Sequence, residues 1–133
     1  MENEPEGLLE ALDIIAENLI AYCQRSLAIG SAGIFMSMWA ADELIRRDNF
    51  LKFVKPPAVK VFKAISDLGK MNTAHIHGEN LFFDDRLDFP ATIFNWWDRS
   101  PQGPSLQWVK DRIPGCVMGG INQKIMARTT REF

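Results

Sequence analysis

The sequence has few cysteines and no long hydrophobic run. Its 133 residues contain two cysteines, which is too few for a disulfide framework and is typical of a reducing compartment, so we expect a cytoplasmic protein. The longest uncharged run, 26–41, is shorter than the ~20 residues that cross a bilayer, and no basic region followed by an apolar one opens the chain. We therefore predict neither a secretory signal nor a membrane partner.

An excess of one charge is also lacking. The chain has 15 Lys and Arg against 17 Asp and Glu, for a net charge of −2. Without a dominant positive field to neutralise phosphates, we predict no nucleic-acid partner. Hydrophobic residues make up 47% and charged residues 24%, as in an ordinary globular domain, which excludes a disordered chain.

The signature motifs of several enzyme classes are missing. No Gly-x-Gly-x-x-Gly and no phosphate-loop motif is present, so the sequence does not support a dinucleotide or nucleotide site. The Gly-x-Ser-x-Gly motif, which carries the nucleophile of many hydrolases, is absent too. The length and the lack of an obvious linker predict a single domain over residues 1–133.

Apolar residues recur at helical spacing near the start of the chain. Pro5 suits a first turn and Gly30 suits the position after a helix end, so the pattern predicts a helix between them. The stripe expected to be buried consists of Leu8, Leu12, Ile15, Leu19, Cys23 and Leu27.

Strands and helices are expected to alternate over the rest of the chain. Short apolar or β-branched runs predict strands at 33–38, 72–77, 91–96 and 116–118. Helices are predicted at 49–68, 81–87, 106–112 and from 123 onward, with Asp48 and Ser105 as N-caps and a break at Pro56 and Pro57. This order is typical of βαβ units around a parallel sheet.

Two histidines stand out at the end of the second predicted strand. His75 and His77 are the only histidines in the chain, and residues two apart in a strand point to the same face. Together they could hold one divalent metal ion, with Glu79 or Asp42 as a third ligand or outer partner. The alternative is a pair of hydrogen-bonded histidines in a polar pocket without metal.

The other strand ends carry aromatic, charged and glycine residues. Trp96 and Trp97, followed by Asp98 and Arg99, form either a flat ligand platform with a carboxylate-binding fork or a core tryptophan followed by a turn. The pair at 119–120 favours a tight turn. We expect the two cysteines, Cys23 and Cys116, to be small buried apolar residues.

Several segments together resemble a known family. They are 33–42 (GIFMSMWAAD), Phe50 and Phe53 with Val54, Lys55 and Pro56, 73–80 (TAHIHGEN), 94–99 (FNWWDR) and 117–122 (VMGGIN). In this order they resemble the second half of the uroporphyrinogen decarboxylase family, which also contains corrinoid (cobalamin) methyltransferases. The resemblance covers nearly the whole chain.

The resemblance implies a fold and a reaction. The fold is a partial (β/α)₈ TIM barrel with about four of its eight parallel strands, as expected of a truncated or split member. The implied reaction is decarboxylation of the acetate side chains of a tetrapyrrole in porphyrin biosynthesis, and we expect this half chain by itself to be inactive or incomplete. The implied catalytic residues are not assigned. The candidate substrate-binding residues are Ser37, Trp39, Asn95, Trp96 and Arg99.

Two alternatives stay open. In the methyltransferase branch of the family, His75 with His77 and Glu79 would bind zinc, and a corrinoid would be the methyl donor. The chain could also be a non-catalytic half-barrel subunit. Because a half-barrel leaves two strand edges and one sheet face unpaired, we expect a homodimer or a partner half-barrel.

Overall fold

The computed structural model describes residues 4–86, 88–122 and 124–126. The elements in chain order are α1 (Pro5–Ala28), β1 (Phe35–Trp39), α2 (Arg47–Asn49), the π-helical turn η1 (Phe50–Val54), α3 (Lys55–Ile65), β2 (Thr73–His77), the 3₁₀ turn η2 (Phe83–Arg86), β3 (Ile93–Trp96), α4 (Leu106–Lys110) and β4 (Cys116–Met118). The predicted alternation of helices and strands is confirmed. Of the final predicted helix, 124–126 form one helical turn, and 123 and 127–133 lie outside the described residues.

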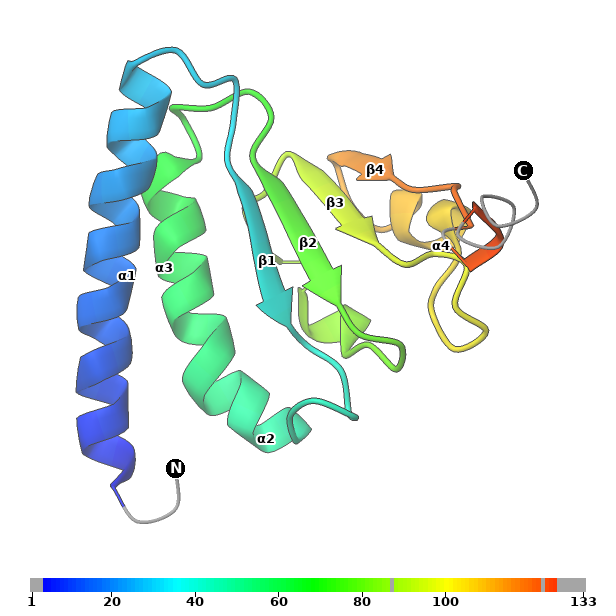
Figure 1. Ribbon diagram of the computed structural model, residues 1–133, viewed down its shortest axis with the longest axis horizontal. Helices are drawn as coiled ribbons and strands as arrows, with labels where there is room; N and C mark the ends of the chain where they lie inside the picture. Colours follow the sequence, from blue (N-terminus) through cyan, green and yellow to red (C-terminus); the bar gives the residue numbers. More distant parts are fainter. Residues whose placement is uncertain (1–3, 87, 123, 127–133) are drawn as a thin grey trace.

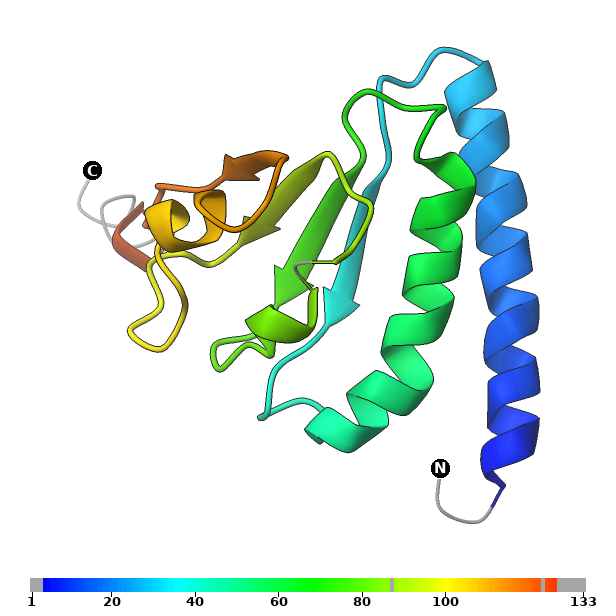
Figure 2. The ribbon, with the colours of Figure 1, turned by 180° about the vertical axis from the view of Figure 1, so that it is seen from behind.

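The four strands form one parallel sheet in the order β1-β2-β3-β4 (Figure 1). Each strand pairs with the next one along the chain, and a helical segment connects them, as in successive units of a (β/α)₈ barrel. The helices α1 and α3 lie side by side along the β1 end of the sheet in both views (Figures 1 and 2). None of the described helices is long and apolar enough to span a bilayer.

Alternation along the strands divides the sheet into two faces. One face packs against α3, η2 and α4, and we call it the covered face; its residues are Met36, Met38, Ala74, Ile76, Phe94, Trp96 and Val117. The opposite set forms the open face: Phe35, Ser37, Trp39, His75, His77, Asn95, Cys116 and Met118. Register places Ser37, His75, Asn95 and Met118 in one row across the open face.

The covered face holds the main core. Ile76 and Phe94 of the sheet and Phe62 of α3 are almost completely buried in it. On the open face, Phe35 is 58% exposed and Trp39 is 61% exposed. Apolar burial on the covered face therefore stabilises the sheet, and the open face can carry side chains that do not contribute to the core.

The first helix is packed on one side only. Ala16 and Cys23 of α1 are buried against Val61 and Ile65 of α3, which confirms the buried position of Cys23. The predicted burial of the stripe was wrong at Ile15 and Leu19, which are 52% and 42% exposed. Leu8, Leu12 and Leu27 are partly buried. The physical reason is that α1 lies at the margin of the helical layer, where α3 contacts only one of its flanks.

Three local predictions can be compared with the structure directly. The break near the two prolines is confirmed: both lie in the first turn of α3, directly after the π-helical turn η1, because proline has no N–H to continue the helical bonds. The Ser105 cap is confirmed, since its hydroxyl accepts from the Trp108 N–H. Asp48 is not a cap, because α2 begins one residue before it at Arg47.

The prediction that Cys116 is buried was wrong. Cys116 is the first residue of β4 and is exposed. It lies opposite Ile93 in the register, on the open face, whereas the neighbouring Val117 packs on the covered face. Strand alternation places Cys116 on the open face, and this position explains why it is exposed.

Candidate functional site

A pocket of about 730 Å³ lies where the strands end. Residues that line it include His75, His77, Asn95, Trp97, Asp98 and Lys124. They come from the carboxyl-terminal parts of β2 and β3 and from the loops that follow β3 and β4. This is the end at which ligands bind in parallel α/β proteins, and the volume is ordinary for a small-molecule site.

The two histidines lie on the same face of β2, as their spacing predicts. Their ring centroids are 5.8 Å apart, and the planes are tilted by 49°. His75 is also stacked on Phe35, with centroids 5.3 Å apart and planes 25° apart. His75 is half-buried between its neighbours, whereas His77, one step nearer the pocket mouth, is exposed.

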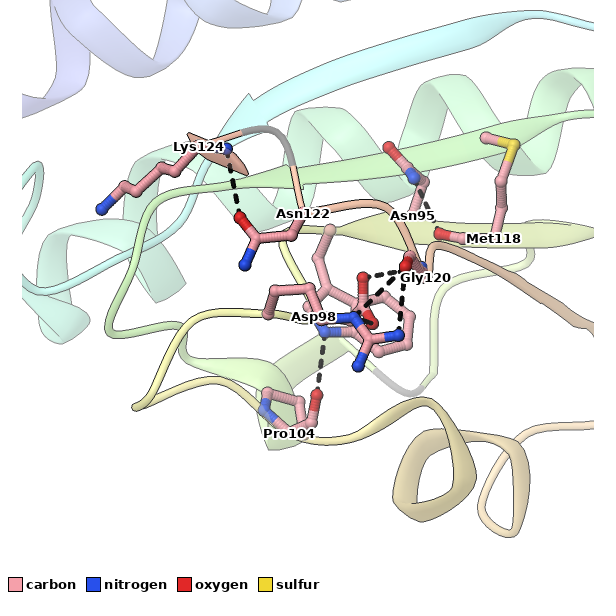
Figure 3. A network of polar contacts seen from close by, with 9 residues as sticks. Asn95, Asp98, Pro104, Met118, Gly120, Asn122 and Lys124 are labelled. Carbon is pink, nitrogen blue, oxygen red and sulfur yellow. Dashed lines mark hydrogen bonds and ion pairs between the residues drawn. The ribbon is translucent and has the colours of Figure 1, made fainter. Parts of the chain in front are cut away.

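A chain of polar contacts crosses the open face from β2 to β4. Nδ1 of His75 lies 2.6 Å from Oδ1 of Asn95. The amide Nδ2 of the same asparagine donates to the Met118 carbonyl at 2.8 Å (Figure 3). Both polar ends of Asn95 are therefore engaged by the protein itself.

Glu43 braces the loop that follows β2. Its carboxylate accepts hydrogen bonds from the backbone N–H groups of Glu79 and Asn80. These bonds, that from Glu79 first, lower the pKa of Glu43, and the charge of His77 adds a smaller contribution. Gly78 permits the turn, because its φ is +128° and a Cβ would lie 2.1 Å from the Cβ of Ala41.

Asp98 and Arg99 tie the loop after β3 to the loop after β4. Asp98 accepts from the Gly120 N–H at 2.9 Å, and its second oxygen lies 3.3 Å from Nε of Arg99. Arg99 also donates to the Gly120 carbonyl at 3.0 Å. A Cβ on Gly119 would lie 2.6 Å from the Asp98 carboxylate, so this close approach needs glycine. We call this set the loop clasp: Asp98, Arg99, Gly119 and Gly120.

The adjacent tryptophans point to different surroundings. Trp96 borders the pocket, but its ring is buried in the core at 3% exposure, edge-on to Phe83. Its N–H donates to the Pro104 carbonyl. Trp97 lines the pocket, with the Lys124 ammonium 4.1 Å from its ring centroid. The same ammonium lies 3.6 Å from a Glu79 carboxylate oxygen.

The structure separates the residues singled out in the sequence. His75, His77, Glu79 and Asn95 line the pocket, whereas Ser37, Trp39 and Arg99 are not among its lining residues. Ser37 and Trp39 lie on β1, opposite His75 and His77 in the register, and Arg99 is held in the loop clasp. The sequence did not predict Glu43 or Lys124 as pocket residues, because Glu43 reaches the pocket from the turn after β1 and Lys124 from the helical turn after β4, and no local pattern reveals these paths.

The metal-ligand set is not assembled among the residues that the structure describes. No three His, Cys, Asp or Glu side chains come together there in a way that could hold a metal ion. Glu79 is near Lys124 and does not complete a group with His75 and His77. The two imidazoles thus provide two ligands, fewer than the three or four that zinc sites use.

The fold and the position of the pocket define the class of protein. Parallel strands joined in order by helices, with a pocket at their carboxyl ends, form part of a (β/α)₈ barrel. A family model described as uroporphyrinogen decarboxylase (URO-D) matches residues 1–133. The chain therefore belongs to the uroporphyrinogen decarboxylase family, which confirms the resemblance and the partial barrel. Searches of curated proteins and of solved structures found no match.

Proposed function

We propose that the pocket binds a cyclic tetrapyrrole and that the chain acts in decarboxylation of its acetate side chains, in porphyrin biosynthesis. The observation that carries this proposal is the pair of imidazoles, His75 and His77, on the open face beside a pocket of about 730 Å³. Family membership supports the substrate class. A cytoplasmic location belongs to the same proposal, supported by the low cysteine content.

The pocket chemistry suits such a ligand. A porphyrinogen presents pyrrole N–H groups at its centre and carboxylates at its rim, and an imidazole can accept from the first and, when protonated, donate to the second. Trp97 offers a flat wall beside the cation of Lys124. We assign carboxylate binding to Lys124 in preference to Arg99, because the guanidinium is already bonded within the loop clasp.

Decarboxylation also needs a proton donor. The bond between the methylene carbon and the carboxylate breaks, carbon dioxide leaves, and a proton takes its place on the carbon. Imidazole is the side chain best suited to transfer protons near neutral pH. We therefore expect one of the two histidines to take part in this transfer.

We further propose that a second copy covers the open face. The outer edges of β1 and β4 pair with no other described strand, and the open face exposes Phe35, Trp39 and Met118. Unpaired edges and exposed apolar patches favour association. Light scattering at micromolar concentration should give a dimer, and Trp39→Lys should shift it toward the monomer. A stable wild-type monomer would contradict this assembly and favour a separate partner half-barrel.

The proposed function is tested with uroporphyrinogen as substrate and with uroporphyrin as a stable binding probe. Wild-type protein should bind uroporphyrin and, as the assembled dimer, convert uroporphyrinogen to products with fewer carboxylates, separated after oxidation to porphyrins. The double variant His75→Ala/His77→Ala should lose at least ten-fold in affinity. Lys70→Ala, an exposed change at the other end of the sheet, is the control and should bind normally. Equal binding by the double variant would refute the assigned site.

A second candidate is a zinc-dependent methyl transfer with a corrinoid as methyl donor. The shared face of His75 and His77 favours it, but the described residues supply only two ligands, so a third ligand must come from elsewhere. Metal analysis tests this candidate: one zinc per chain, lost in His75→Ala, would favour it over the decarboxylase. Binding of neither zinc nor uroporphyrin would favour a non-catalytic subunit.

A further inference from the structure

The amide of Asn95 has only one orientation that satisfies its two neighbours. The Met118 carbonyl oxygen can only accept a hydrogen bond, so the amide group that faces it at 2.8 Å must be the NH₂ group. The amide oxygen then faces Nδ1 of His75 at 2.6 Å. The contact with Met118 thus fixes which end of Asn95 meets the imidazole.

This orientation determines the proton position on His75. An amide oxygen has no hydrogen to donate, so a hydrogen bond to it requires a hydrogen on Nδ1. In the neutral ring the hydrogen then sits on Nδ1 and the lone pair on Nε2. The Met118 carbonyl thus fixes the orientation of the Asn95 amide, and the amide oxygen fixes the position of the hydrogen on the His75 ring.

The second nitrogen of the ring remains available to a ligand. Nε2 has no hydrogen-bond partner within the part of the chain that the structure describes, and His75 lines the pocket. The stacked Phe35 ring restrains the plane of the imidazole. Asn95 therefore fixes the tautomer and position of the His75 ring, and Phe35 restrains its tilt.

We propose that Asn95 is a positioning residue, which holds His75 as the Nδ1–H tautomer so that Nε2 presents its lone pair to a hydrogen-bond donor of the ligand. A pyrrole N–H is such a donor. This role differs from direct substrate contact by Asn95, since both of its polar ends are already used. The identity of the donor rests on the proposed function, whereas the tautomer does not.

Nitrogen NMR of the imidazole tests the tautomer directly. The chain has only two histidines, so His77→Gln leaves His75 as the single imidazole signal. In ¹⁵N-labelled protein at a pH where the ring is neutral, we expect a protonated Nδ1 and an unprotonated Nε2. A protonated Nε2 in this protein would overturn the proposal, whatever the ligand.

Two changes at position 95 separate positioning from packing. Asn95→Asp keeps an accepting oxygen and should keep the Nδ1–H tautomer. Asn95→Leu has a similar shape without polar atoms and should lose that preference. If the leucine variant does not fold, the aspartate variant alone tests the proposal. It loses the hydrogen bond to the Met118 carbonyl, but His75 must still carry its hydrogen on Nδ1.

Uroporphyrinogen binding under anaerobic conditions distinguishes this inference from the proposed function. If positioning matters, Asn95→Leu should weaken binding several-fold while Asn95→Asp retains more of it. Nδ1–H together with no tetrapyrrole binding by wild-type protein would refute the function and leave the tautomer standing. Binding by a protein whose His75 carries its hydrogen on Nε2 would refute the positioning role and leave the function standing.

Discussion

The covered and open faces of the sheet are built from alternate residues of the same strands, yet they differ in chemistry. In β3, Phe94 is 1% exposed in the core, and the next residue, Asn95, belongs to the polar row of the open face. Apolar burial on one face stabilises the sheet, so the other face need not be apolar. The open face can therefore carry polar side chains that form the pocket and contribute little to stability.

The largest expected effect comes from matched phenylalanine changes on the two faces. Phe94→Ala on the covered face should lower the free energy of unfolding by about 3–5 kcal/mol, because it leaves a cavity in the core. Phe35→Ala on the open face, measured at a protein concentration where the dimer has dissociated, should cost less than about 1 kcal/mol, since its side chain is 58% exposed in the single chain. Denaturant unfolding measures both. Equal losses in the dissociated protein would contradict the difference between the two faces.

A smaller effect is expected from adding one methyl group at a glycine. Gly119→Ala would place a carbon against the Asp98 carboxylate in the loop clasp and should destabilise by about 1–3 kcal/mol. Gly7→Ala is the control, because a Cβ there meets nothing within 4 Å and alanine favours a helix. Thermal unfolding of the two variants should shift in opposite directions. A neutral Gly119→Ala would show that the clasp is loose.

The cap of α4 tests whether the two faces are separable. Ser105→Ala removes the hydroxyl that accepts from Trp108 and should cost about 1 kcal/mol. Because α4 packs on the covered face, uroporphyrin affinity should stay the same. Denaturant unfolding measures the stability loss, and a binding titration measures the uroporphyrin affinity. A loss of affinity along with stability would show that the two faces do not act separately.

The smallest effect concerns the brace at Glu43. Its folded-state pKa is lowered from 4.5, so its carboxylate stabilises the folded protein above that pH, and this contribution is lost as pH falls through the lowered value. Glu43→Gln should therefore be less stable than wild type near neutral pH, and the difference should shrink in acid. Melting temperatures across pH measure it, with Glu10→Gln on the exposed side of α1 as control. A difference independent of pH would contradict the brace.

Regular elements were predictable because their periods are local. The apolar run at β1 and the β-branched and aromatic run at β3 each predicted a strand, and the spacing of His75 and His77 predicted their common face. Burial of Ile15 and Cys116 was not predictable, because it depends on which neighbours an element has.

The polar partners of the site were harder to predict than its histidines. The sequence left Arg99 as either a carboxylate-binding fork or part of a turn, whereas in the structure it bonds to Gly120, which lies 21 residues later. Glu43 accepts from an N–H 36 residues away. Such contacts follow from the register of neighbouring strands and the paths of their loops. Neither can be predicted from the residue pattern of a single segment.

The most direct test of the account is an NMR map of uroporphyrin binding on ¹⁵N-labelled protein. Amide signals are expected to shift at 75–79, 95–98, 118–122 and Lys124, around the pocket of the open face, while those of α3 on the covered face stay in place. Shifts concentrated on α3, with 75–79 unchanged, would contradict it.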